Sequence, residues 1–212
     1  MQSNADSAAE NPKDRQKYFV KPWEVNEPFS HFLYYLQDQS LQHAVDWNVK
    51  YSQTRIFTLK VTERSTDTGT PENDNLRGEY LKLYQDVEPD IRWASIALQR
   101  KPDAVNLWIG NSYSATALHR DNYENVYCQI LGGKDFVLLP PLEIACVNEQ
   151  FLFSATYSET MELIPDDPPV QVPCAIWDPD KSDQHTTVFS HRSRPIRVGL
   201  EPGDMLYLPA CW

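Results

Sequence analysis

A histidine and an aspartate stand two residues apart in the sequence, at His119 and Asp121. Residues two apart on an extended strand point to the same face, so these two side chains would share a face while Arg120 points away. A histidine and a carboxylate on one face are two of the three ligands of the 2-His-1-carboxylate site of non-haem Fe(II) oxygenases. The alternative is a surface strand with a histidine and an ion-paired aspartate, and the spacing alone does not separate the two.

A lysine follows at a position where its charge bears on the chemistry. The pair Gly132-Gly133 is a strong signal for a two-residue hairpin turn between two β-rich runs. Directly opposed residues of such a hairpin share a face, which would put Asn125, Tyr127 and Lys134 on one side. If that side is the barrel interior, the ammonium group of Lys134 needs an anion, and a dicarboxylate cosubstrate would supply one. Otherwise Lys134 is an ordinary charged residue of a hairpin.

Short β-rich runs, separated by Gly, Pro or Asp turns, make up much of the chain from Ala104 onward. The runs are AVNLWIG, VYCQIL, KDFVLLP, IRVGL and MLYLP. Their spacing predicts an all-β barrel or sandwich. Between them, residues 143–195 are Pro-rich and irregular, and we expect this long segment to lie across the outside of the barrel as a lid or a homodimer contact.

The part of the chain before these runs has a different character. Residues 1–16 are small and polar and predict a disordered tail, which leaves residues 17–212 for the domain. Apolar positions at helical spacing predict a short amphipathic helix at residues 29–36. A second helix is expected at residues 93–98, closed off by the Lys-Pro-Asp sequence that starts at Lys101.

Composition limits the classes of function. The 212 residues are 41% hydrophobic and 12% aromatic, which suits one globular domain. A formal net charge of −11 argues against binding to nucleic acid or to an anionic membrane, and favours a basic peptide as partner. Four scattered cysteines and no signal-like start indicate reduced thiols in a cytoplasmic or nuclear protein. No apolar run approaches the roughly 20 residues of a membrane helix.

Residues 102–141, which contain the His-x-Asp pattern, closely resemble the JmjC family of oxygenases, and most closely the jumonji domain-containing protein 7 group of small lysyl hydroxylases. Residues 73–80, 172–180 and 201–212 resemble the same group, so that the similarity covers about residues 18–212. The resemblance implies a mainly β fold, a double-stranded β-helix (cupin or jelly-roll) barrel with flanking N-terminal helices.

The resemblance assigns His119 and Asp121 to Fe(II). In the family, the strand that matches the run before Trp212 leads into a tryptophan and, two residues later, into the distal histidine ligand. The third ligand is therefore expected just beyond Trp212, and the closing C-terminal strands are expected to be missing from this chain. His185 and His191 are not expected to replace that ligand, because they lie in an irregular polar segment.

The resemblance also implies a site for 2-oxoglutarate. Lys134 would pair with the distal carboxylate, helped by the hydroxyl groups of Thr116 and Tyr51, and Asn125 would form a hydrogen bond near the keto-acid end. Relatives run almost directly from the motif that contains Tyr51 to the residues that match 73–80. Residues 55–72 are therefore expected to be either an inserted surface loop or a stretch that comes from an imperfect gene model.

The function implied by the resemblance is an Fe(II)- and 2-oxoglutarate-dependent protein hydroxylase, acting on a lysyl residue and inactive in this chain for want of its third ligand. One alternative is a non-enzymatic cupin-like binding module or remnant. A second alternative is a histone lysine or arginine demethylase, although no zinc-binding reader motif accompanies the domain and its net charge is acidic.

Overall fold

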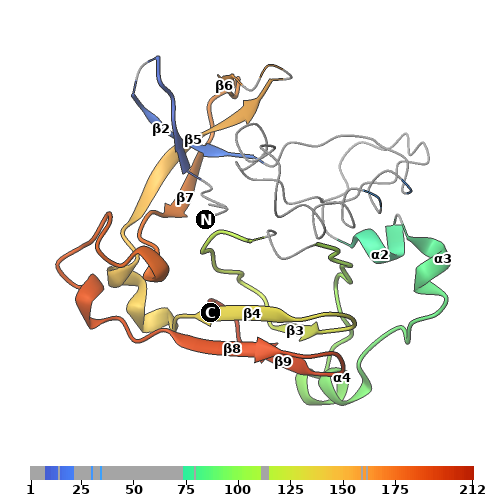
Figure 1. The fold of residues 1–212 in the computed structure, drawn as a ribbon. Coiled ribbons are helices and arrows are strands. Elements are labelled where there is room, and N and C mark those ends of the chain that lie inside the picture. Colours follow the sequence, from blue (N-terminus) through green and yellow to red (C-terminus); the bar gives the residue numbers. More distant parts are fainter. Residues whose placement is uncertain are drawn as a thin grey trace. The chain divides into compact units, whose positions relative to one another are not determined.

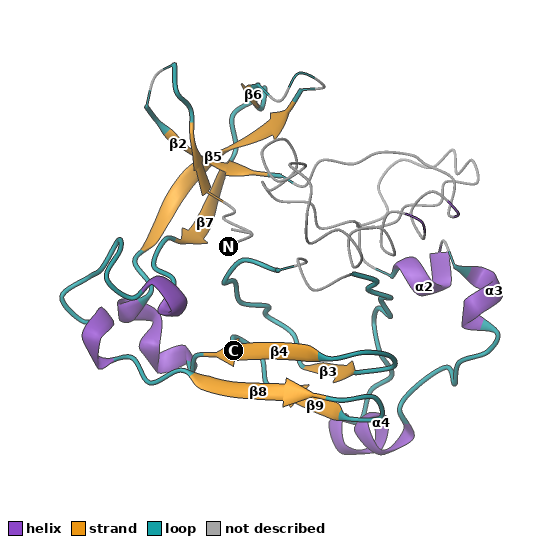
Figure 2. Cartoon of the chain, in the orientation of Figure 1, coloured by secondary structure: helices purple, strands orange, loops and turns teal. Residues whose placement is uncertain are grey.

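The computed structural model describes residues 8–13, 15–21, 30, 34, 74–78, 80–110, 115–158, 160 and 162–212. These residues belong to two compact units. One unit consists of Met1–Ala5 and Pro22–Thr116, and the other of Asp6–Lys21 and Ala117–Trp212. The described elements are mostly strands, with few helices (Figures 1 and 2).

The described helices of the first unit are short. They are α2 (Asn75–Gly78), α3 (Leu81–Tyr84) and α4 (Arg92–Leu98). Helix α4 confirms the helix expected at residues 93–98. It ends because Gln99 adopts a left-handed conformation, with φ of 53°, and its N–H bonds back to the last turn. The helix expected at residues 29–36 and the insert expected at residues 55–72 lie almost entirely outside the described residues.

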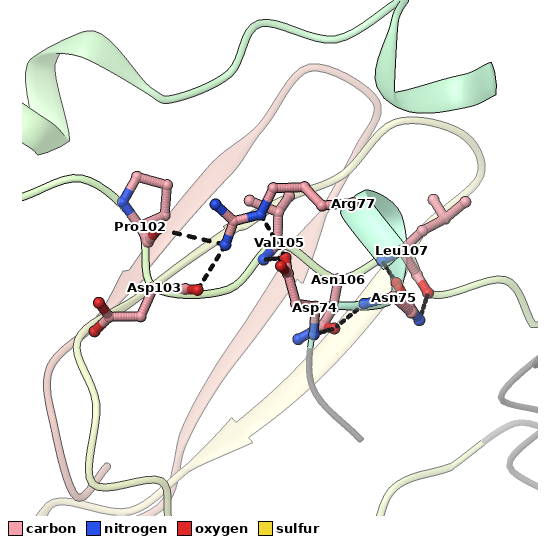
Figure 3. Close-up of polar contacts among 8 residues, drawn as sticks. All are labelled: Asp74, Asn75, Arg77, Pro102, Asp103, Val105, Asn106 and Leu107. Carbon is pink, nitrogen blue, oxygen red and sulfur yellow. Dashed lines mark hydrogen bonds and ion pairs between the residues drawn. The ribbon is translucent and has the colours of Figure 1, made fainter. Parts of the chain in front are cut away.

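No strand forms at residues 104–110, so that prediction is wrong. Side chains at the start of α2 form hydrogen bonds with the backbone groups of this segment instead (Figure 3). Asn75 donates from Nδ2 to the carbonyl of Leu107 over 3.1 Å and accepts from its N–H over 2.7 Å. Asp74 Oδ1 accepts from the N–H of Val105 over 2.8 Å. Side chains therefore satisfy backbone groups that a neighbouring strand would otherwise satisfy.

The largest sheet of the second unit has five strands. They are β1 (Ala8–Glu10), β2 (Lys17–Val20), β5 (Glu149–Tyr157), β6 (Leu163–Pro165) and β7 (Gln171–Ala175). Their order is β1-β2-β5-β6, and β7 also pairs with β5. Strand β2 runs parallel to β5, and the other pairs are antiparallel. Pairing with β2 thus makes a strand of three residues within the stretch 1–16, where composition predicts a disordered tail.

The segment 143–195 is not irregular, because it contains β5, β6 and β7 together with short 3-10 turns. The irregular structure was predicted from the proline content of this segment, but two of its prolines lie in strands. Pro173 lies in β7, and Pro165 ends β6. Among the described strands, both β6 and β7 pair with β5 alone, so they form an edge of this sheet. Proline lacks the N–H that a central strand must donate, and it is therefore tolerated at such edges.

Two further sheets have two strands each. Strand β3 (Asn125–Cys128) pairs with β9 (Met205–Leu208), and β4 (Lys134–Leu138) pairs with β8 (Ile196–Leu200). The predicted hairpin between β3 and β4 is therefore wrong. The reason lies at Gln129, whose backbone N–H donates to Asp204 and whose carbonyl accepts from Gly203. These bonds continue the pairing with the β9 side, so Gln129 has no backbone groups left for Phe136.

Tyr127 and Lys134 nevertheless both lie near Phe136, on facing sides of the two ladders. The ring centroids of Tyr127 and Phe136 are 5.0 Å apart in an edge-to-face contact, and Lys134 Nζ lies 5.9 Å from the centroid of Phe136. Because side chains alternate along a strand, Asn125 shares the face of Tyr127, and Lys134 shares that of Phe136. The grouping arises between two facing ladders rather than within one hairpin. Over the described residues, these sheets do not close into a barrel.

Candidate metal and cosubstrate site

Residues 117–121 carry the two predicted metal ligands on a segment whose side chains are anchored alternately. Leu118 packs against a buried cluster, and Arg120 forms an ion pair of 3.1 Å with Glu149. The buried cluster consists of Leu139, Val147 and Trp177. His119 lies between Leu118 and Arg120 in the sequence, and Asp121 follows Arg120. The side chains of His119 and Asp121 are 59% and 56% exposed. Both side chains are therefore open to solvent, on a segment whose neighbouring side chains contact the rest of the unit.

The geometry of His119 defines which of its nitrogens is available. Nδ1 lies 2.7 Å from the carbonyl oxygen of Ala117. A carbonyl oxygen can only accept, so Nδ1 carries the proton, and in the neutral ring Nε2 keeps its lone pair. Nε2 lies 4.0 Å from Oδ2 of Asp121, too far for a hydrogen bond between them. Metal-binding histidines commonly donate their other N–H to a carbonyl in this way.

A third ligand does not join this pair in the part of the chain that the structure describes. No group of three or more His, Cys, Asp or Glu side chains lies close enough there to hold a metal ion. His185 and His191 are both exposed; His191 lies in the 3-10 turn η4 (Ser190–Arg192), and His185 lies in the loop before that turn. Their exclusion as ligands stays a prediction.

The last residues of the chain run past Asp121. The N–H of Cys211 donates to the carbonyl of Asp121 over 2.7 Å, and its thiol lies 3.7 Å from Asn122 Oδ1. Strand β9 is antiparallel to β3, so residues after Leu208 lie beside residues before Asn125. The structure thus places Cys211 beside the segment that contains His119 and Asp121.

The residues expected to hold 2-oxoglutarate are distributed between the units. Lys134 and Asn125 are half-buried on the facing ladders, and Asn125 Nδ2 donates to the carbonyl of Tyr123 over 3.2 Å. Among the described residues, no carboxylate lies within ion-pair distance of Lys134. Thr116 is exposed and is the last residue of the first unit. Tyr51 lies outside the described residues.

Comparison with known proteins identifies the family. The profile of the cupin-like domain matches residues 1–212, the whole chain. This chain belongs to the cupin-like family of JmjC domain proteins. The family resemblance seen in the sequence is thereby confirmed.

Three relatives illustrate the range of this cupin-like family. The chain is 36% identical over 142 residues to a human bifunctional peptidase and (3S)-lysyl hydroxylase, covering 65% of the chain and 45% of that protein. It is 34% identical over 153 residues to a lysine-specific demethylase of Arabidopsis thaliana, covering 66% and 44%. It is 27% identical over 221 residues to JmjC domain-containing protein E of Dictyostelium discoideum, covering 96% and 57%. The chain thus spans about half the length of these relatives.

The contact between Arg120 and Glu149 is a feature of this cupin-like domain that the sequence did not reveal. The His-x-Asp spacing indicated only that Arg120 points away from the ligands. Its partner stands 29 residues further on, at the start of β5, in a segment whose strands the prolines concealed. None of the helices that the structure describes is long and apolar enough to span a membrane.

Proposed function

We propose that this cupin-like domain carries the metal and cosubstrate site of an Fe(II)- and 2-oxoglutarate-dependent protein hydroxylase that acts on a lysyl side chain. The arrangement of His119 and Asp121 is the observation that carries the proposal. The hydrogen bond from His119 Nδ1 to the carbonyl of Ala117 leaves the lone pair of Nε2 available to a metal ion, 4.0 Å from a carboxylate oxygen. An imidazole nitrogen beside a carboxylate oxygen is the donor set of non-haem Fe(II) oxygenases.

The chain's own part in this chemistry is to hold and orient. Fe(II) and 2-oxoglutarate, when bound, would supply the oxidation of an unactivated C–H bond. His119 is kept in one tautomer by Ala117, and the backbone of Asp121 is tied to Cys211. The His119 ring is thus oriented before an ion arrives, and the backbone that carries the Asp121 carboxylate is held in place, which reduces the cost of binding the ion.

Lys134 would bind the distal carboxylate of 2-oxoglutarate. Lys134 is a half-buried residue whose Nζ lies beside Phe136, and it has no acidic partner among the described residues, so its ammonium group favours an anion. Asn125 on the facing ladder would supply a hydrogen bond near the keto-acid end. Thr116 and Tyr51 are included on the family resemblance alone.

The finer fold that we propose is the double-stranded β-helix of the family, with the ladders β3–β9 and β4–β8 as parts of its two facing sheets. The antiparallel run of the chain supports a third ligand after Trp212. Residues that follow Leu208 move from Asn125 toward Asp121, so a histidine two positions beyond Trp212 would come alongside His119.

A lysine side chain in a protein is the substrate that the relatives favour. The human relative is named for lysyl hydroxylation and the Arabidopsis relative for lysine demethylation, at similar identity to this chain. A net charge of −11 suits a basic partner. The four cysteines, all of them described, form no disulfide with one another, and two are buried, which supports a cytoplasmic or nuclear location.

Two other functions have observations in their favour. Demethylation is supported by the Arabidopsis relative, at 34% identity. A binding module without catalysis stays an alternative, in which the exposed side chains of His119 and Asp121 would hold an ion without turnover. The mass of the peptide product separates hydroxylation from demethylation. If a folded, metal-loaded protein yields no modified peptide, the binding module is favoured.

The test is succinate formation from 2-oxoglutarate with and without Fe(II), in the presence of a lysine-containing basic peptide. The 212-residue chain is compared with a chain extended beyond Trp212 by an aromatic residue, a histidine and the following strands of a relative. We expect Fe(II)-dependent turnover and a hydroxylated peptide from the extended chain only, and none from its His119→Ala variant. Robust turnover by the 212-residue chain would contradict the need for that ligand.

A further inference from the structure

The ion pair between Arg120 and Glu149 holds the segment that bears the proposed metal ligands. Nη2 of Arg120 lies 3.1 Å from one carboxylate oxygen of Glu149 and 3.4 Å from the other. Arg120 stands between His119 and Asp121 in sequence, so any movement of its backbone moves both ligands. The pair therefore connects the metal segment to the five-stranded sheet.

The metal segment has little else to fix its position. Residues 115–124 form no strand. Between described residues, the backbone bond that reaches residues 117–121 comes from Cys211, next to the end of the sequence. Leu118 fixes the segment on one side of His119 by packing into the core. Arg120 fixes it on the other side.

Glu149 is a firm point of attachment. It is the first residue of β5, where its backbone pairs with Ala175 of β7, and β5 is the strand on which β2, β6 and β7 converge. Its side chain is 27% exposed, so the carboxylate is partly withdrawn from water and holds Arg120 better than a fully exposed one would. Glu149 also neutralises a guanidinium group that would otherwise repel a divalent cation bound between its neighbours.

We infer that Arg120 and Glu149 are positioning residues for the His119–Asp121 pair, acting as one unit that keeps both ligands aligned for a divalent cation. This inference rests on the proposed function, because it concerns the same site. Neither residue would touch the metal. A partner that orients metal ligands typically changes metal affinity by 10- to 100-fold, and an exposed ion pair contributes less than a buried one. We therefore expect an effect of about threefold to tenfold.

The experiment measures Mn(II) affinity of the whole chain by electron paramagnetic resonance. The variants are Arg120→Gln, Glu149→Gln, the double variant, and Arg120→Lys. Each single Gln variant should weaken Mn(II) binding by about threefold to tenfold. The double variant should lose no more affinity than the single variant that binds Mn(II) more weakly, because the two residues act as one unit. Arg120→Lys should lose less affinity than Arg120→Gln. The control is Arg197→Gln, which removes the exposed ion pair between Arg197 and Asp180 away from the ligands. It should leave Mn(II) affinity unchanged.

A second measurement separates this inference from the proposed function. Long-range ¹H–¹⁵N NMR of the His119 ring in metal-free protein should show the Nδ1–H tautomer in the wild type and a mixture in the Arg120→Gln and Glu149→Gln variants. Wild-type Mn(II) affinity and an unchanged tautomer in these variants would overturn the inference, as would an equal loss in Arg197→Gln. A wild-type chain that binds no Mn(II), yet shows the expected tautomer changes, would support the positioning role and refute the proposed metal site.

Discussion

Two polar clusters of this chain, one in each unit, use similar side chains to different ends. Around Asp74, the carboxylate accepts from Arg77 Nε over 2.6 Å and from the N–H of Val105, while Asn106 Oδ1 accepts from two further backbone N–H groups (Figure 3). Asp74 has a φ of 92°, a left-handed conformation that these bonds hold in place. At the other cluster, the hydrogen bond that His119 forms with a described residue involves Nδ1, and Nε2 forms none with the described part of the chain.

The difference between the clusters indicates which polar residues are structural. Donors and acceptors that are satisfied within the protein have nothing left for a ligand, whereas a cluster that keeps donor atoms open can bind one. The Asp74 cluster belongs to the first kind, and the His119–Asp121 pair to the second. Substitutions should therefore affect stability at the first cluster and binding at the second.

The largest effect is expected from His119→Ala. It removes one of two donor groups, so the affinity for Mn(II) should fall by at least the roughly 100-fold that loss of an outer partner can cause, or about 2.8 kcal/mol at 1.4 kcal/mol per tenfold. The free energy of unfolding should hardly change, because the side chain is exposed. Titration of Mn(II) and urea denaturation measure the two quantities. Unchanged affinity would place His119 with the structural residues.

Lys134→Ala tests whether a residue with a charged group available to a ligand contributes to 2-oxoglutarate binding. Loss of a hydrogen bond to a charged group should weaken 2-oxoglutarate binding by about 1.5–3 kcal/mol. Anaerobic calorimetric titration of the extended chain with Mn(II) in place of iron measures it. Lys82→Ala, on the exposed surface of α3, is the matched control. Equal affinities in the two variants would remove Lys134 from the site.

Asn75→Ala tests the satisfied cluster. The side chain is buried, and its removal leaves both backbone groups of Leu107 without their partner, which should cost about 1–3 kcal/mol of unfolding free energy. Mn(II) affinity should stay at the wild-type value. Urea denaturation measures the loss, with the exposed Gln184→Ala as control. A variant as stable as the control would mean that the network is incidental.

The smallest effect concerns Asp166, a satisfied carboxylate in the second unit. Bonds from Lys21 at 2.8 Å and from Ser154 at 2.5 Å lower its pKa in the folded protein, with Lys21 the largest cause. A lowered folded pKa stabilises the fold at pH values above the unfolded pKa of about 3.9, and this contribution is lost as pH falls through the folded value. In Asp166→Asn, the free energy of unfolding should fall less steeply with acidification below about pH 4. Identical slopes would contradict this.

The family and several elements of the fold were predictable from the sequence because their signals are local. Helix α4 follows from a short periodic pattern and the proline after it. The spacing of His119 and Asp121 predicted a strand there, but residues 115–124 form none. The runs that became β3, β4, β8 and β9 were visible for the same reason. The family followed from the motif around His119.

The strand partners and the anchoring contacts were decided only by the tertiary structure. Gln129 bonds with the β9 side instead of turning into a hairpin, and Asn75 replaces a strand beside Leu107. Arg120 finds Glu149 at the start of a strand that the prolines concealed. In each case, segments far apart in sequence compete for the same backbone or charged groups. The local pattern records that a group needs a partner, but only the folded chain determines which segment supplies it.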